Sequence, residues 1–312
     1  MSIILIIIGM ILLIKCADWF VDGCSNVAKS LGIPSLIIGL TIVAFGTSAP
    51  EAAVSITASI NGLNDISLGN VVGSNICNLL LVLGLSGMVG SLTAKRKIIT
   101  RDFIYAIFSS IVMLILSFGF FTSGKTEGVI TRTNGLILLC FLGIYLYALI
   151  GDALRSVRTK EEKTEFNPKD ILLIIIGIVG IILGGQLVVN SATDIANMFN
   201  VSQNVIALTI VAIGTSLPEL VTSVVASKKG EVDIAIGNVV GSNIFNIFFI
   251  LGISSAISPI TYGFESFVDI IVMVISSIVV YLLLLKNNRI GNKKGIILLA
   301  LYAIYMFYIL VR

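Results

Sequence analysis

The chain has 312 residues, of which 57% are hydrophobic and 12% are charged, with no histidine and a net charge of +3. Its mean hydropathy is +1.08, whereas charged residues make up about a quarter of a soluble domain. This composition excludes a soluble domain. We predict a polytopic membrane protein that contacts the lipid bilayer and no nucleic acid.

Apolar runs long enough to cross a bilayer follow one another along the whole chain. A helix needs about 20 residues to cross roughly 30 Å of hydrocarbon. Such runs lie at residues 2–29, 37–60, 67–92, 103–121, 134–150, 171–199, 205–227, 235–259, 266–285 and 293–311. The first run has no basic residue before it and no small-residue cleavage site after it, so we predict a helix there and not a signal peptide. The sequence therefore predicts an all-α membrane protein with ten transmembrane helices.

The first predicted helix carries charged residues near its end. Lys15, Asp18 and Asp22 lie close to Trp19 in the sequence. An ion pair beside an aromatic residue at the membrane interface is the ordinary interpretation of such a group.

The second predicted helix contains the segment AFGTSAPE at residues 44–51. Pro50 has no N–H to donate, so we expect the carbonyl of Gly46 to lack its helical partner. An unpaired carbonyl in hydrocarbon is costly unless protein, water or an ion satisfies it. The spacing i, i+3, i+4, i+7 and i+11 places on one helical face Ala44, Thr47, Ser48, Glu51 and Ser55. Glu51 has no basic residue close enough in its own helix, and a carboxylate at mid-membrane indicates function, so we predict a bound cation as its counter-charge.

The third predicted helix contains GNVVGSNICN at residues 69–78. Ser74 and Asn78 are spaced i, i+4, so a hydroxyl and an amide share one face. Gly69 and Gly73 form a GxxxG step that lets helices approach closely.

The polar stretch at 151–170 is predicted to be a solvated linker between a first half at 1–150 and a second half at 171–312. Residues 208–252 match residues 40–84 without a gap at 27 of 45 positions, so we infer an internal duplication. Because each half has an odd number of spans, the second copy enters the membrane from the opposite side. Inverted repeats are typical of alternating-access transporters, although repeats also occur in channels.

The duplication repeats the polar residues of both segments. AIGTSLPE presents on one face Ala212, Thr215, Ser216, Glu219 and Ser223, and GNVVGSNIFN presents Ser242 and Asn246. The asparagines common to both copies suit hydrogen bonds between helices as well as a binding site; they are Asn70, Asn75, Asn238 and Asn243. The same offset of 168 residues pairs Asp18 with Gln186 and Asp22 with Asn190.

The repeated polar groups are carboxylates, hydroxyls, amides and backbone carbonyls, without imidazole or thiol. Hard oxygen ligands suit Ca²⁺ and Na⁺ better than transition metals, and two carboxylates match the charge of one Ca²⁺. The four cysteines are expected to be small apolar fillers without disulfides; they are Cys16, Cys24, Cys77 and Cys140.

Basic residues are distributed unevenly between the loops of the two sides. If the N-terminus is outside, 16 Lys and Arg lie in inner loops and three in outer ones, with Lys15 inside the first span. Inner loops carry an excess of Lys and Arg. We therefore predict a multi-pass protein with both termini outside and the linker at 151–170 in the cytoplasm. The shortness of this linker favours a prokaryotic plasma-membrane protein, with an organelle membrane as the alternative.

The two motif pairs, AFGTSAPE with GNVVGSNICN and AIGTSLPE with GNVVGSNIFN, resemble those of the sodium/calcium exchangers of the cation/Ca²⁺ antiporter superfamily. The resemblance implies ten helices in two inverted five-helix repeats, with the first and sixth helices sliding over the core. It also implies that Glu51 and Glu219 are the central shared ion ligands. The other ligands that it implies are Thr47, Ser48, Ser74, Asn78, Thr215, Ser216, Ser242 and Asn246, with the carbonyls of Ala44 and Ala212. Asn246 resembles the potassium-independent, prokaryotic type.

The function that this resemblance implies is exchange of about three Na⁺ for one Ca²⁺ by alternating access. We expect a transporter that is not an enzyme, has no cofactor and acts as a monomer. One alternative is H⁺/Ca²⁺ antiport, with protons on the two glutamates. Proton-coupled relatives carry an additional acid in the glycine-asparagine helix, where both copies here read GNVVGSN. A passive Ca²⁺ channel or a cation-sensing membrane protein is the alternative from another class. Channels need weak binding at several sites, which two buried carboxylates do not favour.

Overall fold

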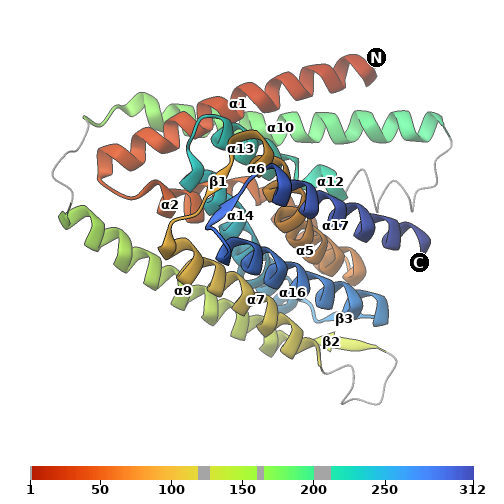
Figure 1. The fold of residues 1–312 in the computed structure, drawn as a ribbon. Helices are drawn as coiled ribbons and strands as arrows, with labels where there is room; N and C mark the ends of the chain where they lie inside the picture. Colours follow the sequence, from red (N-terminus) through yellow and green to blue (C-terminus); the bar gives the residue numbers. More distant parts are fainter. Residues whose placement is uncertain (1, 119–126, 160–164, 200–211) are drawn as a thin grey trace.

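The computed structural model describes residues 2–118, 127–159, 165–199 and 212–312 (Figure 1). Its first half contains α1 Ser2–Leu31, α2 Ser35–Ile38, η1 Gly39–Val43, α3 Ala44–Thr47, α4 Ala49–Ile60, α5 Asn64–Cys77, η2 Asn78–Val82, α6 Leu83–Gly90, β1 Leu92–Thr93, η3 Ile98–Asp102, α7 Phe103–Ser117, β2 Gly128–Ile130 and α9 Arg132–Thr159. Its second half contains α10 Pro168–Met198, α12 Ala212–Thr215, α13 Leu217–Lys228, α14 Val232–Phe245, η5 Asn246–Leu251, α15 Gly252–Ile257, β3 Ile260–Tyr262, α16 Phe264–Leu285, β4 Arg289–Ile290 and α17 Asn292–Val311. The η segments are short stretches of π-helix that continue the neighbouring α-helices.

The predicted all-α membrane architecture is confirmed, and its helix count is confirmed in part. Within the described ranges, eight helices are long and apolar enough to cross a membrane, or nine if the bent pair Ser35–Thr47 and Ala49–Ile60 is one span. The tenth predicted span, at 205–227, begins outside the described residues, and its described part forms α12 and α13.

The ends of the predicted linker at 151–170 are helical. α9 continues through Thr159, and α10 begins at Pro168. The residues after position 150 include Ala, Leu and Arg, which are good helix formers, so the helix extends past the apolar span. The side chain of Asn167 accepts a hydrogen bond from the backbone N–H of Lys169 and starts α10.

The two longest helices, α1 and α10, lie side by side along one edge of the molecule (Figure 1). A Cβ on Gly9 would lie 3.0 Å from the carbonyl of Gly184, and one on Gly180 would lie 2.2 Å from the Cys16 sulfur. The start of α1 therefore packs against the C-terminal half of α10. The two helices are antiparallel, as inversion of the repeat requires. Small residues allow this close packing.

The centre of the molecule is formed by α5 and α14, which continue through η2 into α6 and through η5 into α15. The two helices meet at Asn75 and Asn243. The side-chain amide of Asn75 donates to the Asn243 carbonyl at 3.2 Å, and that of Asn243 donates to the Asn75 carbonyl at 3.3 Å. These reciprocal bonds mark the point where the two repeats cross.

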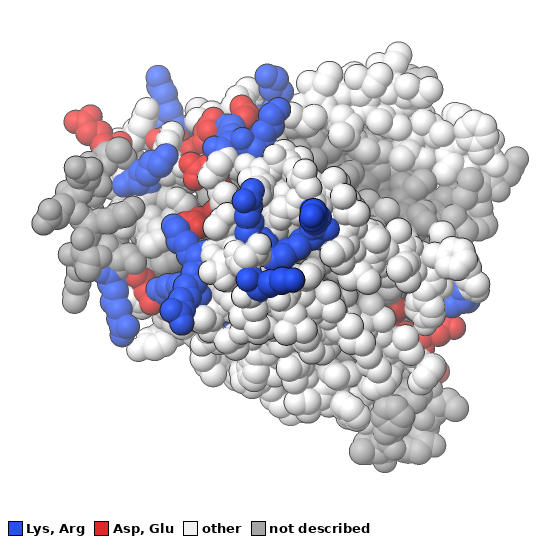
Figure 2. All heavy atoms as spheres, viewed as in Figure 1, with Lys and Arg blue, Asp and Glu red and all other residues white. Residues whose placement is uncertain are grey.

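Two short ribbons join loops of the two halves. β1 pairs antiparallel with β4, with Leu92 opposite Ile290, and β2 pairs antiparallel with β3, with Val129 opposite Thr261. Figure 2 shows Lys and Arg gathered mainly at one end of the molecule, on the left, with a broad uncharged surface beside them. The uncharged belt is the surface expected of a protein that contacts lipid.

Candidate ion-binding site

The two predicted motif helices are broken at the same place. α3 ends at Thr47 and α4 begins at Ala49, with Ser48 between them at ψ 6° and a bend of 49°. In the second half, Ser216 separates α12 from α13, also at ψ 6°.

The prolines of the motif start helices. Pro50 lies in the first turn of α4 and Pro218 in the first turn of α13, where a missing N–H has no intrahelical acceptor to lose. Pro50 cannot donate to the carbonyl of Gly46, as expected, but this carbonyl is not free, because another backbone N–H at the end of α3 donates to it. The chain breaks at Ser48, and the last turn tightens to satisfy this carbonyl.

Each break places a glutamate in the first turn of the next helix, Glu51 in α4 and Glu219 in α13. Both side chains are fully buried. A helix N-terminus favours a carboxylate, but no ion pair found in the described part of the chain includes either residue. The Oε2 atom of each glutamate has no hydrogen-bond partner.

The hydroxyl of each break reaches the carboxylate of the other repeat. Ser48 Oγ donates to Glu219 Oε1 at 2.8 Å, and Ser216 Oγ donates to Glu51 Oε1 at 3.3 Å. Ser242 Oγ lies 3.4 Å from both Glu219 Oε1 and the carbonyl oxygen of Ala44. The structure thus brings these groups of the two repeats into one cluster.

The threonines of the motif join this cluster through two asparagines. Thr47 Oγ1 donates to Asn238 Oδ1 at 3.0 Å. Thr215 Oγ1 donates to Asn70 Oδ1 at 3.3 Å. The amide of each asparagine donates in turn to its own repeat, that of Asn70 to Ser55 Oγ at 2.8 Å and that of Asn238 to Ser223 Oγ at 2.9 Å.

These asparagines therefore fix the threonines of one repeat against the glutamate helix of the other. From the sequence, Asn70 and Asn238 suited either hydrogen bonds between helices or a binding site. The available signal was their presence at the same place in both GNVVGSN segments.

Further buried oxygens lie without partners on the central helices. Ser74 Oγ and both polar atoms of Asn78 have no hydrogen-bond partner. Asn246 donates its amide to Asn75 Oδ1 at 3.0 Å, which leaves Asn246 Oδ1 without a partner. Buried polar atoms are normally hydrogen-bonded, so this group of exceptions is suited to a ligand that offers positive charge.

The carbonyl of Ala212 stays a prediction, because α12 begins at this residue, at the margin of the described part of the chain. Cys77, expected to be an apolar filler, is buried and interacts with Ser216 and Tyr302. A thiol therefore lies beside the hydroxyl that binds Glu51. The described residues hold no cluster of three or more His, Cys, Asp or Glu, so a cation here would rely on two carboxylates and neutral oxygens.

A cavity of about 300 Å³ lies beside this cluster, between α10 on one side and α4 and α13 on the other, and Thr215 of the cluster is in its wall. Its lining includes Pro50, Gln186, Asn190, Thr215 and Pro218. A larger cavity of about 640 Å³, around β3 and the start of α16, contains none of the predicted site residues.

Comparisons with known proteins agree with this architecture. The family model described as sodium/calcium exchanger protein matches residues 1–151 and 169–311. The chain is 30% identical to the sodium/calcium exchanger MaX1 of Methanosarcina acetivorans, over 98% of each protein. It is 37% identical to the inner membrane protein YrbG of Escherichia coli, over 82% of this chain and 79% of that protein.

The fold is also similar to that of solved sodium-calcium exchanger structures. A structure of the sodium-calcium exchanger NCX_Mj, soaked with Na⁺ and Sr²⁺, superposes with a TM-score of 0.84 at 34% identity, over 98% of this chain and 97% of the other. The protein is a multi-pass membrane antiporter, and it belongs to the sodium/calcium exchanger protein family.

Proposed function

We propose that the protein exchanges about three Na⁺ for one Ca²⁺ at a single site built around Glu51 and Glu219, reached alternately from the two sides of the membrane. The observation that carries this proposal is the pair of fully buried carboxylates, each with one oxygen that lacks a hydrogen-bond partner. An unpaired buried charge is strongly destabilising, so the site requires cations to balance it.

The surrounding atoms favour Ca²⁺ and Na⁺ as those cations. Hydroxyl, amide and carbonyl oxygens from both repeats surround the carboxylates, and hard oxygen ligands in a flexible arrangement suit these two ions. The ligand set that we propose is Glu51, Glu219, Thr47, Ser48, Ser74, Asn78, Thr215, Ser216, Ser242 and Asn246, with the carbonyls of Ala44 and Ala212. The names of two similar proteins, MaX1 and NCX_Mj, point to the same pair of ions.

Coupling follows from competition for the two carboxylates. Because Na⁺ and Ca²⁺ would use the same oxygens, one bound species excludes the other. The empty site carries two negative charges, and their transfer through the apolar core is unfavourable. The site therefore changes the side that it faces only when Na⁺ or Ca²⁺ is bound. Each release of Ca²⁺ on one side must be followed by binding of Na⁺ there, or the reverse, before the site can return.

Alternating access is supported by the inverted arrangement of the halves, for which we propose the boundaries 1–150 and 171–312. α1 and α10 pack against each other in opposite directions, and a cavity lies beside the site on one side, with Thr215 in its wall. With both termini outside, as the charged loops indicate, this cavity faces outward.

The test is ⁴⁵Ca²⁺ uptake into Na⁺-loaded proteoliposomes diluted into buffer without Na⁺ or K⁺. We expect uptake that requires internal Na⁺ and is unchanged by an imposed pH gradient. Uptake driven by a pH gradient without Na⁺ would mean proton coupling at the same site, and uptake without any counter-ion would mean a channel.

A further inference from the structure

The structure is open on one side of the motif helices and closed on the other. On the open side, the cavity of about 300 Å³ separates α10 from α4, and Ala53 of α4 is exposed in its wall. On the closed side, α1 packs directly along α13. Val21 and Val221, which occupy the positions equivalent to Val189 and Ala53, are 0% and 8% exposed.

A lysine ties α1 to the end of α13 on the closed side. Lys229 Nζ lies 2.7 Å from Asp18 Oδ1, 2.7 Å from Asp22 Oδ1 and 3.0 Å from the Asp18 carbonyl oxygen. The expected interfacial ion pair near Trp19 is therefore present, but its cation comes from the other half of the chain and not from Lys15. All three N–H groups of the ammonium have an acceptor.

The same turn makes a second contact with α1. Glu231 Oε1 accepts a hydrogen bond from Ser25 Oγ at 2.6 Å and lies 3.7 Å from Lys29 Nζ. Gly230 between Lys229 and Glu231 adopts φ +79°, which permits the tight turn. The turn thus holds α1 from Asp18 to Lys29.

The equivalent positions of the open side carry no charge. The offset of 168 residues relates Asp18 and Asp22 to Gln186 and Asn190 in the cavity wall, and Lys229 to Asn61. Gly62 forms the same turn at φ +73°, so the turn itself does not need the charges. The charged residues occur where α1 contacts α13. They are absent from the equivalent positions of α10 and α4, which the cavity separates.

We infer that Lys229, Asp18 and Asp22 form an ionic latch that holds α1 against α13 and keeps this side closed, so that the protein favours the state open on the opposite side. The inference rests on the proposed alternating access, in which α1 moves against the core. For α1 to slide, the bonds of Lys229 to the two aspartates must break.

The latch is partly exposed, which limits its strength. The side chains of Lys229, Asp18 and Asp22 are 25%, 44% and 52% exposed, and exposed ion pairs contribute little. Desolvation lowers the pKa of Lys229, but the hydrogen bonds with Asp18 and Asp22 outweigh it and raise the pKa overall. With one cation between two carboxylates, we expect the latch to shift the ratio of the two states about threefold to tenfold.

The test uses two reporter cysteines at equivalent positions of the full-length protein, after Cys16, Cys24, Cys77 and Cys140 are replaced by alanine. Val221→Cys reports opening of the closed side, and Ala53→Cys reports the open side. Labelling rates with a water-soluble maleimide are measured in saturating Ca²⁺. Lys229→Gln is expected to raise labelling of Val221→Cys about threefold to tenfold and to lower that of Ala53→Cys.

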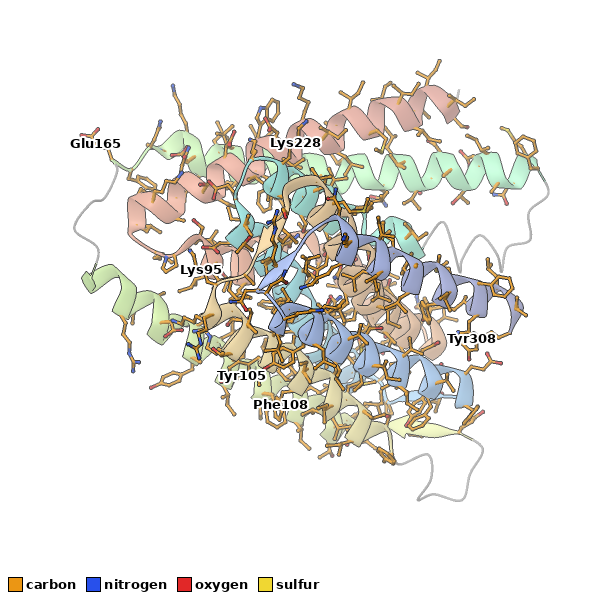
Figure 3. All side chains as sticks on the ribbon, in the orientation of Figure 1. Lys95, Tyr105, Phe108, Glu165, Lys228 and Tyr308 are labelled. Carbon is orange, nitrogen blue, oxygen red and sulfur yellow. The ribbon has the colours of Figure 1, made fainter. Side chains whose placement is uncertain are left out.

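Matched variants isolate the latch. Lys228→Gln removes the same charge one residue away, from a side chain labelled in Figure 3 that forms no ion pair in the described structure, and should leave both rates unchanged. Lys229→Arg should retain the wild-type rates. The double variant Asp18→Asn with Asp22→Asn should reproduce the effect of Lys229→Gln.

Equal rates in Lys229→Gln and Lys228→Gln would overturn the latch, as would faster labelling at both reporters, which would indicate local loosening. Na⁺-driven ⁴⁵Ca²⁺ uptake is measured on the same proteins. Normal uptake with unshifted labelling refutes the latch alone. Absent uptake in the wild type refutes the proposed exchange, whatever the labelling shows.

Discussion

Buried oxygens without partners gather where the two motifs meet. Glu51 and Glu219 each leave Oε2 unsatisfied, and Asn78 and Asn246 add further oxygens without hydrogen-bond partners. In the absence of ions such a group opposes folding, because unsatisfied buried polar atoms and unpaired charges are unfavourable. Stability given up at a functional site is common in proteins, and here it implies opposite effects of mutation on stability and on ion binding.

Replacement of either glutamate by glutamine should therefore have two opposite effects. Glu51→Gln and Glu219→Gln are each expected to reduce Na⁺-driven ⁴⁵Ca²⁺ uptake at least about a hundredfold, because the shared charge is lost. The melting temperature of the ion-free protein should rise, and the added stability that Ca²⁺ gives the wild type should disappear.

The control for this pair is Glu265→Gln, whose side chain is 73% exposed and lines the cavity around β3 that contains none of the proposed ligands. It should change neither uptake nor the Ca²⁺-dependent melting temperature. Retention of Ca²⁺-dependent stabilisation in both site variants would show that Ca²⁺ binds elsewhere.

The serine at the helix break should contribute to affinity. Ser48→Ala removes the hydroxyl that donates to Glu219 Oε1 at 2.8 Å and deletes a proposed ligand. A hydrogen bond to a charged group contributes about 1.5–3 kcal/mol, so the concentration of Ca²⁺ for half-maximal uptake should rise about tenfold or more. Ser109→Ala, at a buried serine whose hydroxyl donates to the Ala106 carbonyl within α7, should leave it unchanged, and equal values in the two variants would contradict the role of Ser48.

The residue types of the cluster could be predicted from the sequence, but the hydrogen bonds between the two repeats could not. The spacing from Ala44 to Glu51 predicted hydroxyls and a carboxylate on one face of a continuous helix, but the helix breaks at Ser48 with a bend of 49°. The spacing could not show that Ser48 donates a hydrogen bond to Glu219 and Ser216 to Glu51, because these bonds depend on how the two halves pack against each other. The ion pairs of Lys229 could not be predicted for the same reason, because Asp18 and Asp22 lie 211 and 207 positions away in the sequence.

Helix packing at the scale of elements depends on glycine between α1 and α10. A Cβ on Gly177 would lie 2.7 Å from Phe20 Cβ and 2.9 Å from the Cys16 carbonyl oxygen, so the helices meet almost backbone to backbone. This contact allows sliding only while the seam stays free of side chains. The apolar pattern predicted both helices, but their contact needed the structure.

Gly177→Ala and Gly143→Ala should therefore have opposite effects on stability. The first overpacks the seam and should destabilise by about 1–3 kcal/mol and slow Ca²⁺ uptake. The second has nothing within 4 Å of its new Cβ in α9, so helix propensity should stabilise by about 0.5–1 kcal/mol. Thermal unfolding in detergent compares them, and a stabilising Gly177→Ala would show that the seam is looser than described.

The whole molecule combines the halves so that charge moves with each cycle. Ca²⁺ would leave the site of two glutamates neutral, whereas three Na⁺ would leave it with one positive charge. Net movement of one charge is coupled to about 2.3 kcal/mol per 100 mV. The ratio of Ca²⁺ inside to outside at equilibrium should therefore change about fiftyfold per 100 mV, measured in vesicles clamped with K⁺ and valinomycin. A ratio that does not depend on voltage would indicate electroneutral exchange.

The central claim is that Na⁺ and Ca²⁺ take turns at one site. The most direct measurement is simultaneous ²²Na⁺ efflux and ⁴⁵Ca²⁺ uptake in the same proteoliposomes. The predicted result is about three Na⁺ released for each Ca²⁺ taken up, with Na⁺ efflux falling to background when external Na⁺ and Ca²⁺ are both absent. Na⁺ efflux that continues without any external exchanging ion would contradict the account.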